Sequence, residues 1–203
     1  MIKFYPRYGK RAFDILGSAC LLVPATPVMG AIAIALRLGQ GSPVLFRHER
    51  SGQDGLPFEV LKFRTMSPAV AGKTREERVT RMGRVLRRSS FDELPQLYNV
   101  LRGDMSLVGP RPLPRRYDAL YSLEHRRRLN VRPGLTGLTQ ISGRNSLPWE
   151  VRFDLDVKYV ERVSFWTDAR ILFRTAKVLI HVDRDRDSTS PSSEYDGAAE
   201  VTL

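Results

Sequence analysis

The chain has 203 residues, a formal net charge of +11 and a single cysteine. This length accommodates one compact domain plus a membrane element and excludes a second large catalytic domain, because single cores usually comprise roughly 100 to 200 residues. One cysteine excludes a disulfide within the chain. The positive charge predicts an anionic partner: nucleic acid, an anionic lipid surface or a phosphorylated small molecule.

An apolar segment covers residues 15–36. As a helix of roughly 22 residues it would be about 33 Å long, barely enough to cross a hydrocarbon core of about 30 Å. Basic residues flank it on both sides, and such flanks favour the cytoplasmic face. They are Lys3, Arg7, Lys10 and Arg11 before the segment and Arg37, Arg47 and Arg50 after it. A re-entrant hairpin satisfies both flanks, so we expect it in preference to a straight crossing.

Two prolines, Pro24 and Pro27, lie near the centre of this segment. Each removes a backbone donor and clashes with the preceding turn, which predicts a sharp bend. The hydroxyl of Thr26 could return a hydrogen bond to the freed carbonyls. We therefore predict a break of the membrane helix at Pro24, Thr26 and Pro27, with residues 1–40 as the re-entrant hairpin.

The rest of the chain predicts an α+β fold, mainly helical with a short β-hairpin. Two β-rich runs at 44–46 and 58–63 enclose a turn that contains Gly and Asp and form the predicted hairpin. Residues 67–83 predict a loop with a short helix at 74–82, and helical patterns follow. These patterns cover residues 84–88, 91–102, 113–128, 148–161 and 167–181. Residues 41–181 thus form the main domain, and the polar segment 182–203 has almost nothing apolar to bury and predicts a disordered tail.

Several predicted helices mix aromatic and basic residues. The members of this group are Arg115, Arg116, Tyr117, Tyr121, Trp149, Phe153, Lys158, Tyr159, Phe165 and Trp166. Such a mixture suits amphipathic helices that lie in the headgroup region of a membrane. Ordinary packing of amphipathic helices on one another explains it equally well.

An acidic pair, Asp92-Glu93, opens the predicted helix 91–102. Ser90 and Asp92 are both competent N-caps, Glu93 follows Ser90 at the spacing of a capping box, and Pro95 is tolerated only near a helix start. A helix N-terminus attracts phosphate oxygens and keeps a carboxylate ionised. Taken alone, such a pair is more often a simple cap.

Cations near this pair indicate a second role. Arg87 and Arg88 precede the pair, Lys62 ends the second β-rich run, and Arg111 is held between Pro110 and Pro112. The two prolines restrict the backbone, so the guanidinium could bind a diphosphate at low entropic cost. If they converge, these groups suit phosphoryl transfer, in which a carboxylate, Mg²⁺ and fixed cations neutralise developing charge.

Two glycine turns, at 134–137 and at Gly143, lie beside Arg132 and Arg144. Glycine there could let the backbone approach a nucleotide, or it could simply permit tight connections. The chain contains neither a Walker-type loop nor a dinucleotide fingerprint, which gives no support to nucleoside triphosphate hydrolysis.

The ordered series of these motifs resembles the bacterial sugar transferase family, the monotopic phosphoglycosyl transferases that begin glycoconjugate assembly on polyprenol phosphate. The similarity extends from residue 10 to residue 180. The matching segments are Lys10-Arg11-Ala12-Phe13-Asp14, Lys62-Phe63-Arg64-Thr65-Met66, the pair Asp92-Glu93, Gly109-Pro110-Arg111-Pro112 and Arg132-Pro133-Gly134-Leu135-Thr136-Gly137.

The resemblance implies that Asp92 is the nucleophile. Its carboxylate would attack the sugar-bearing phosphate of a UDP-sugar, release UMP and leave a covalent phosphosugar-aspartyl enzyme, which polyprenol phosphate then attacks. The resemblance also implies Mg²⁺ at Asp92 and a supporting or base role for Glu93. Phosphate or nucleotide contacts are implied for Lys62, Arg87, Arg111 and Arg144.

The resemblance further implies a place of action. It is the inner leaflet of the bacterial cytoplasmic membrane, where domain 41–181 would face the cytosol and catalyse the first membrane step of glycoconjugate or exopolysaccharide assembly. The family has a Ser-Pro pair where this chain has Thr26-Pro27; threonine keeps the hydroxyl, so we expect the break to be intact, although the bend angle could differ. The family usually has glutamine where this chain has His48, so donor preference could differ. We expect no nucleic-acid partner and regard a homodimer as possible.

Two other hypotheses compete with this one. The chain could be a basic peripheral protein that binds a membrane or nucleic acid without catalysis. Alternatively, the acidic pair could serve only as a metal ligand, with direct transfer in a ternary complex.

Overall fold

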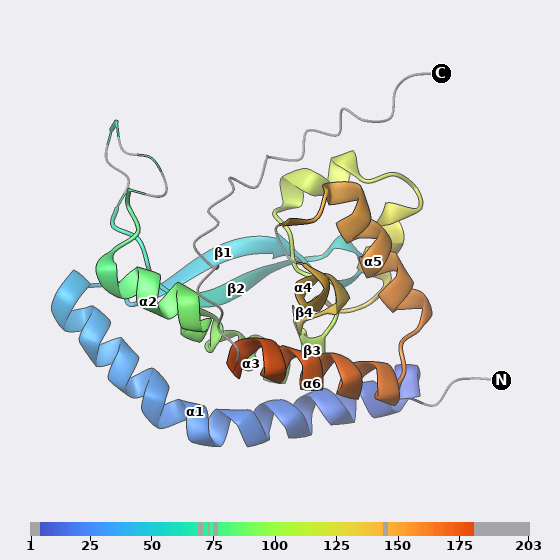
Figure 1. The fold of residues 1–203 in the computed structure, drawn as a ribbon, viewed down its shortest axis with the longest axis horizontal. Coiled ribbons are helices and arrows are strands. Elements are labelled where there is room, and N and C mark those ends of the chain that lie inside the picture. Colours follow the sequence, from blue (N-terminus) through green and yellow to red (C-terminus); the bar gives the residue numbers. More distant parts are fainter. Residues whose placement is uncertain (1–4, 69–70, 73, 75–76, 144–145, 181–203) are drawn as a thin grey trace.

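The computed structural model describes residues 5–68, 71–72, 74, 77–143 and 146–180, so the predicted tail at 182–203 and the predicted ligand Arg144 lie outside the described residues. A π-helical turn, Tyr5–Gly9, leads into the long helix α1 (Lys10–Gln40). α1 runs along one edge of the molecule, and the other elements lie to one side of it (Figure 1).

Helix α1 continues through Pro24 and Pro27. Figure 1 shows it changing direction near its middle, as expected of a helix in which two backbone donors are missing. The hydroxyl of Thr26 donates to the carbonyl of Leu22 at 2.7 Å. This is the carbonyl four residues back, the usual acceptor for a helical threonine, and not one that lost its donor to a proline.

Helix α1 is long and apolar enough to cross a membrane. Its most apolar 18-residue window has a mean hydropathy of 2.1 and is 6% buried. Both ends of α1 are tied to the domain by hydrogen bonds: at its end, the side chain of Gln40 donates to the Thr80 hydroxyl at 2.9 Å, and Arg64 donates to the Gln40 carbonyl. At its start, Asp14 accepts bonds from the hydroxyl of Ser106 and the backbone N–H of Leu107, both at 3.0 Å, and Arg11 donates to the carbonyls of Val100 and Leu101.

The predicted hairpin is confirmed. β1 (Leu45–Ser51) and β2 (Pro57–Phe63) pair antiparallel, from Leu45 opposite Phe63 to Ser51 opposite Pro57. Helix α3 (Gln96–Arg102) packs on β2 through Asn99, which donates to the Glu59 carbonyl at 2.7 Å and accepts from the Leu61 N–H at 3.0 Å. β1 extends beyond the predicted run at 44–46. Its later residues, 47–51, are all polar, so they show no alternation of apolar and polar side chains from which a strand could be predicted.

The helices α2 (Arg81–Ser89), α5 (Trp149–Glu161) and α6 (Phe165–Ile180) match the patterns at 84–88, 148–161 and 167–181. The helix predicted at 74–82 does not form in the described residues of that segment before α2 begins at Arg81. Val79 pairs instead with Met66 in an isolated bridge, and the hydroxyl of Thr80 accepts from the Gly83 N–H and caps α2.

The predicted helix 113–128 is also wrong. The structure has two 3₁₀ helices there, Arg115–Leu120 and His125–Asn130. The chain becomes extended at Tyr121, and the hydroxyl of Ser122 accepts from the His125 N–H and begins a new turn. Such a local side-chain bond competes with continuation of a helix.

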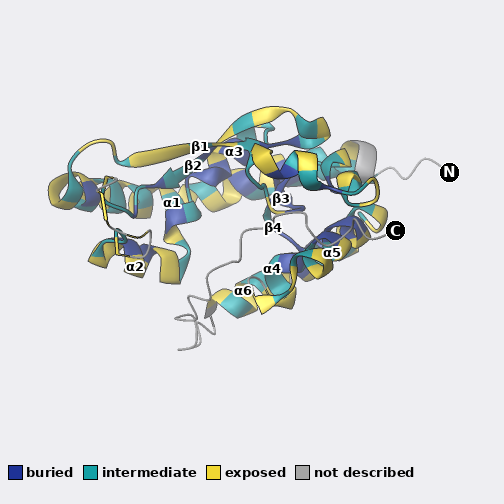
Figure 2. Cartoon of the chain, turned by 90° about the horizontal axis from the view of Figure 1, so that it is seen from above, coloured by how far each residue is buried: buried dark blue, intermediate teal, exposed yellow. Residues whose placement is uncertain are grey.

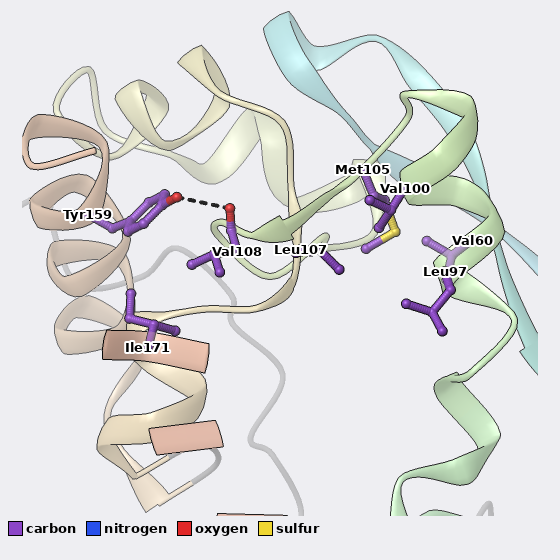
Figure 3. Packing of buried hydrophobic residues seen from close by; sticks show 8 residues of the cluster. All are labelled: Val60, Leu97, Val100, Met105, Leu107, Val108, Tyr159 and Ile171. Carbon is purple, nitrogen blue, oxygen red and sulfur yellow. Dashed lines mark hydrogen bonds between the residues drawn. The ribbon is translucent and has the colours of Figure 1, made fainter. Parts of the chain in front are cut away.

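A parallel pair of three-residue strands, β3 (Ser106–Val108) and β4 (Gly134–Thr136), lies at the centre of the domain. The short helix α4 (Leu138–Ser142) follows β4. The main core surrounds β3, and Figure 3 shows its buried side chains. They are Val60, Leu97, Val100, Met105, Leu107, Val108, Tyr159 and Ile171. Strands this short have too few residues to show alternation, which explains why the sequence did not reveal them.

The aromatic residues of α5 and α6 have different environments. In α5, Phe153 and Tyr159 are buried, so ordinary packing explains them. In α6, Trp166 is 77% exposed and Phe173 is 74% exposed, and this helix carries little of the buried colour in Figure 2. An unpacked apolar surface on a helix calls for another partner.

Candidate active site

The acidic pair lies on a short 3₁₀ turn, Phe91–Glu93, between α2 and α3. The predicted capping box is wrong. Ser90 has a left-handed backbone (φ 61) and its side chain makes no capping bond; its carbonyl accepts from the Glu93 N–H at 3.1 Å instead. A non-glycine residue held in this region carries strain, which is common beside functional groups. The side chains of Asp92 and Glu93 are therefore available for other contacts.

The carboxylate of Glu93 binds two of the predicted cations. One of its oxygens, Oε1, lies 2.6 Å from Nζ of Lys62 on β2 and 3.3 Å from Nη2 of Arg111. Burial favours the neutral acid, but the charges of Arg111 and Lys62 and their hydrogen bonds outweigh burial and lower the pKa of Glu93 to about 2. Glu93 thus stays ionised and holds two cations from distant segments at one place.

Asp92 has the opposite environment. Only 9% of it is exposed. Burial and then the negative charge of Glu93 raise the pKa of Asp92 to about 6, against the opposing charges of Lys62, Arg87 and Arg111. Within the described residues its carboxylate makes no hydrogen bond or ion pair. This carboxylate is therefore ionised at neutral pH and available for chemistry.

Arg87 comes from the last turn of α2, and its Nε donates to the hydroxyl of Thr65 at 2.9 Å. Gly83 lets α2 approach this segment, because a Cβ at Gly83 would lie 2.0 Å from the Thr65 carbonyl oxygen. Thr65 is buried and orients Arg87, a role that the sequence did not single out. The sequence signal for this role of Thr65 was its place in the Lys62–Met66 segment, one of the segments that match the family.

Arg111 lies on the turn that follows β3. Its position depends on close approach of two glycines, since a Cβ at Gly134 would lie 2.0 Å from the Gly109 backbone nitrogen. The N–H of Gly134 also donates to the Pro110 carbonyl at 2.8 Å. A Cβ at Gly137 would meet the Gly109 carbonyl at 2.2 Å. Gly134 and Gly137 therefore serve tight backbone packing, the simpler of the two roles open from the sequence.

The structure thus brings Asp92, Glu93, Lys62, Arg87 and Arg111 together from four separate segments. It does not add Arg132, whose Nε donates to the Gly103 carbonyl at 2.9 Å at the end of α3. Three cations around two carboxylates leave the cluster net positive, which suits a diphosphate.

Asp92 is the group in this cluster that could hold a divalent cation. The described residues contain no group of three or more His, Cys, Asp or Glu placed to hold a metal. Mg²⁺ commonly binds through one or two carboxylates and completes its shell with phosphate oxygens and water. An ionised carboxylate without a partner fits this mode of binding.

Comparisons with known proteins agree with this chemistry. The sequence profile described as bacterial sugar transferase matches residues 5–182. The chain is 42% identical to the uncharacterized sugar transferase EpsL of Bacillus subtilis, over 95% of this chain and 98% of that protein. It is 44% identical to the UDP-glucose:undecaprenyl-phosphate glucose-1-phosphate transferase of Caulobacter vibrioides, over 86% of this chain and 70% of that protein.

Some relatives are longer proteins. The undecaprenyl-phosphate galactose phosphotransferase of Salmonella typhimurium is 38% identical over 87% of this chain, which covers 41% of that protein. The profile match covers residues 5–182, a range that contains the positions of all the predicted site residues. The chain is an enzyme that belongs to the bacterial sugar transferase family.

Proposed function

We propose that the chain transfers a sugar-1-phosphate from a UDP-sugar to polyprenol phosphate through a covalent intermediate on Asp92, and that UMP leaves. The observation that carries this proposal is the division of roles between two adjacent carboxylates. Glu93 binds Lys62 and Arg111, whereas Asp92 makes no ion pair among the described residues. The names of the relatives from Caulobacter vibrioides and Salmonella typhimurium support the substrate classes.

In the first step, an oxygen of Asp92 attacks the phosphorus that bears the sugar. A P–O bond forms to the carboxylate, the P–O bond to the uridine-bearing phosphate breaks, and UMP leaves with the electron pair. Lys62, Arg87 and Arg111 neutralise the charge that develops on the phosphate oxygens. The low pKa of Glu93 makes it a weak proton acceptor, which favours a supporting role over a base role.

In the second step, a phosphate oxygen of polyprenol phosphate attacks the same phosphorus. The bond to Asp92 breaks, and the carboxylate is regenerated beside a polyprenyl diphosphate sugar. Two steps suit a water-soluble donor and a membrane-bound acceptor, because the two substrates need not be bound together. When bound, Mg²⁺ at Asp92 would neutralise charge on the donor diphosphate.

The membrane element belongs to the same proposal. We place α1 as a re-entrant hairpin in the inner leaflet, with the domain facing the cytosol. The start of α6 packs against the start of α1, with the rings of Phe13 and Phe165 5.7 Å apart and Lys10 bound to Asp168 at 2.8 Å. The exposed Trp166 and Phe173 then allow α6 to lie at the membrane interface beside α1.

Intact mass spectrometry tests the covalent step. The purified full chain is incubated with a UDP-sugar and Mg²⁺ but without lipid. We expect the mass of one phosphosugar to be added, and Asp92→Asn to show no addition. Glu93→Gln is the matched control, because it changes the neighbouring carboxylate but keeps the nucleophile. UMP release that requires lipid, with no adduct at any time, would establish direct transfer instead.

A panel of UDP-sugars with polyprenol phosphate tests the transfer itself and identifies the donor by UMP release. The competing role of a non-catalytic binding protein predicts that no donor releases UMP and that Asp92→Asn binds membranes or nucleic acid as the parent chain does. Folded protein in lipid that releases no UMP from any donor would end the proposal.

A further inference from the structure

Arg128 is a buried arginine that takes no part in the cluster described above. Only 3% of it is exposed. Its Nε and Nη2 donate to one oxygen of Asp156 at 3.1 and 2.7 Å, and its Nη1 donates to the Tyr121 hydroxyl at 2.9 Å. Its guanidinium carbon lies 5.3 and 5.6 Å from the ring centres of Tyr121 and Phe153. The guanidinium is thus fixed on every side.

The Nη2 of Arg128 makes one further bond, to the backbone carbonyl of Arg111 at 2.7 Å. Neighbouring carbonyls of the same turn are held in the same way. Tyr159 donates through its hydroxyl to the Val108 carbonyl at 2.9 Å (Figure 3), and the Gly134 N–H donates to that of Pro110. Donors from Arg128, Tyr159 and Gly134 therefore hold the main-chain carbonyls of the segment that carries Arg111.

Stability alone is a weak explanation for this buried ion pair. Moving two charges out of water costs several kcal/mol, and well-packed apolar residues often serve stability as well or better. Asp156 is itself oriented, because its second oxygen accepts from the Thr139 hydroxyl at 2.7 Å. A fully satisfied polar network of this kind specifies one geometry of the groups it contacts.

We infer that Arg128, oriented by Asp156, is a positioning residue for phosphosugar transfer, because it fixes the main chain of Arg111 and thereby the guanidinium that lies at Glu93. The inference rests on the proposed function. Arg128 itself touches no reacting group. Lysine at 128 would keep the charge beside Asp156 but could not donate to Asp156, Tyr121 and the Arg111 carbonyl together.

A double-mutant cycle on the full chain in lipid tests the inference. We expect Arg128→Lys to lower kcat/KM for the UDP-sugar by roughly tenfold or more, since small misplacement of a binding group has large effects on transfer. The relative contributions of a higher KM and a lower kcat to this fall in kcat/KM should be the same in Arg128→Lys as in Arg111→Ala. In the Arg111→Ala background, Arg128→Lys should change kcat/KM by less than about twofold, because the group it positions is gone.

Arg11→Lys is the matched control, since Arg11 also donates to two carbonyls, those of Val100 and Leu101, at the far end of α3. Its effect should be the same in both backgrounds. Should Arg128→Lys fail to fold, Thr139→Val removes the hydroxyl that donates to Asp156 at 2.7 Å and also lies 3.2 Å from the Arg152 carbonyl, leaves Arg128 itself in place, and must show the same coupling to Arg111. Equal losses with and without Arg111 would overturn the inference, whereas an inactive parent chain would overturn the proposed function instead.

Discussion

At the scale of single residues, Asp92 and Glu93 are adjacent in the chain but respond to the fold in opposite directions. Burial and Glu93 raise the pKa of Asp92 to about 6, while Arg111 and Lys62 overcome burial and lower the pKa of Glu93 to about 2. A raised pKa means that folding disfavours the ionised form, and a lowered pKa means that folding favours it. The same pair of residues therefore predicts two opposite effects on stability.

Asp92→Asn should stabilise the protein at neutral pH while it abolishes transfer. The cost of ionised Asp92 begins above the unfolded pKa, near 4, and is complete above about 6. Its removal should raise the free energy of unfolding at pH 7.5 by about 1 to 3 kcal/mol, with little gain at pH 4. Denaturant unfolding in EDTA measures this without bound metal. A variant less stable than the parent at pH 7.5 would contradict the prediction.

Glu93→Gln should destabilise the protein at pH 7.5. Ionised Glu93 stabilises the folded state above its unfolded pKa, near 4.5, and this contribution disappears as the pH falls through about 2. We expect a loss of about 1 to 3 kcal/mol, reduced from the full linkage value because Lys62 and Arg111 are partly exposed. The same unfolding experiment measures it. Equal effects of the two substitutions would show that the two carboxylates share one environment.

At the scale of elements, the sequence predicted those whose local pattern is strong. The hairpin β1–β2 and the helices α2, α5 and α6 follow from periodicity. The strands β3 and β4 do not, because three residues carry no period and their pairing depends on the approach of Gly109 and Gly134. The helix predicted at 113–128 failed because Ser122 caps a new turn and Arg128 is committed to Asp156.

The candidate site was predictable to the same extent. Residue type and spacing pointed to Asp92, Lys62, Arg87 and Arg111, and the fold brings these side chains together. The use of Glu93 as a ligand for two cations was hidden, because the capping-box spacing from Ser90 gave it a local explanation. The supports Thr65 and Arg128 were hidden too, since their roles come only from tertiary contacts.

The placement of α2 yields a prediction at this scale. Gly83→Ala would put a Cβ 2.0 Å from the Thr65 carbonyl oxygen, so α2 must move and the contact of Arg87 with Thr65 must weaken. We expect a loss of about 1 to 3 kcal/mol in stability and a higher KM for the UDP-sugar. Gly39→Ala is the control, because a Cβ there has nothing within 4 Å. It should be neutral or slightly stabilising in a helix.

At the scale of the whole molecule, two helices with large exposed apolar side chains, α1 and α6, lie on the same side. In Figure 1, α1 and α6 lie along one edge, and the two 3₁₀ helices between β3 and β4 lie at the opposite edge. The exposed side of α6 also carries basic residues, Arg170, Arg174 and Lys177. Aromatic and basic residues together on an interfacial helix favour an anionic membrane surface. The fold thus brings the helix that we propose to enter the membrane and the helix that we propose to lie on it to the same side.

The two tryptophans of the chain can test this orientation separately. Trp166 is 77% exposed on α6. Trp149, on α5, packs against Phe153 and against Tyr117 of the 3₁₀ helix Arg115–Leu120, with the guanidinium carbon of Arg152 4.4 Å from its ring centre. In a Trp149→Phe variant, Trp166 is the sole tryptophan, and its emission should shift to the blue in anionic vesicles and be quenched by lipids brominated near the headgroup. In Trp166→Phe, the remaining Trp149 should show neither change, because its ring packs against other protein side chains.

Quenching of Trp149 alone would reverse the orientation and place α5, not α6, on the membrane. Both variants keep the acidic pair and its cations, so UMP release measured on the same samples shows whether the protein that gives the fluorescence result is the active enzyme.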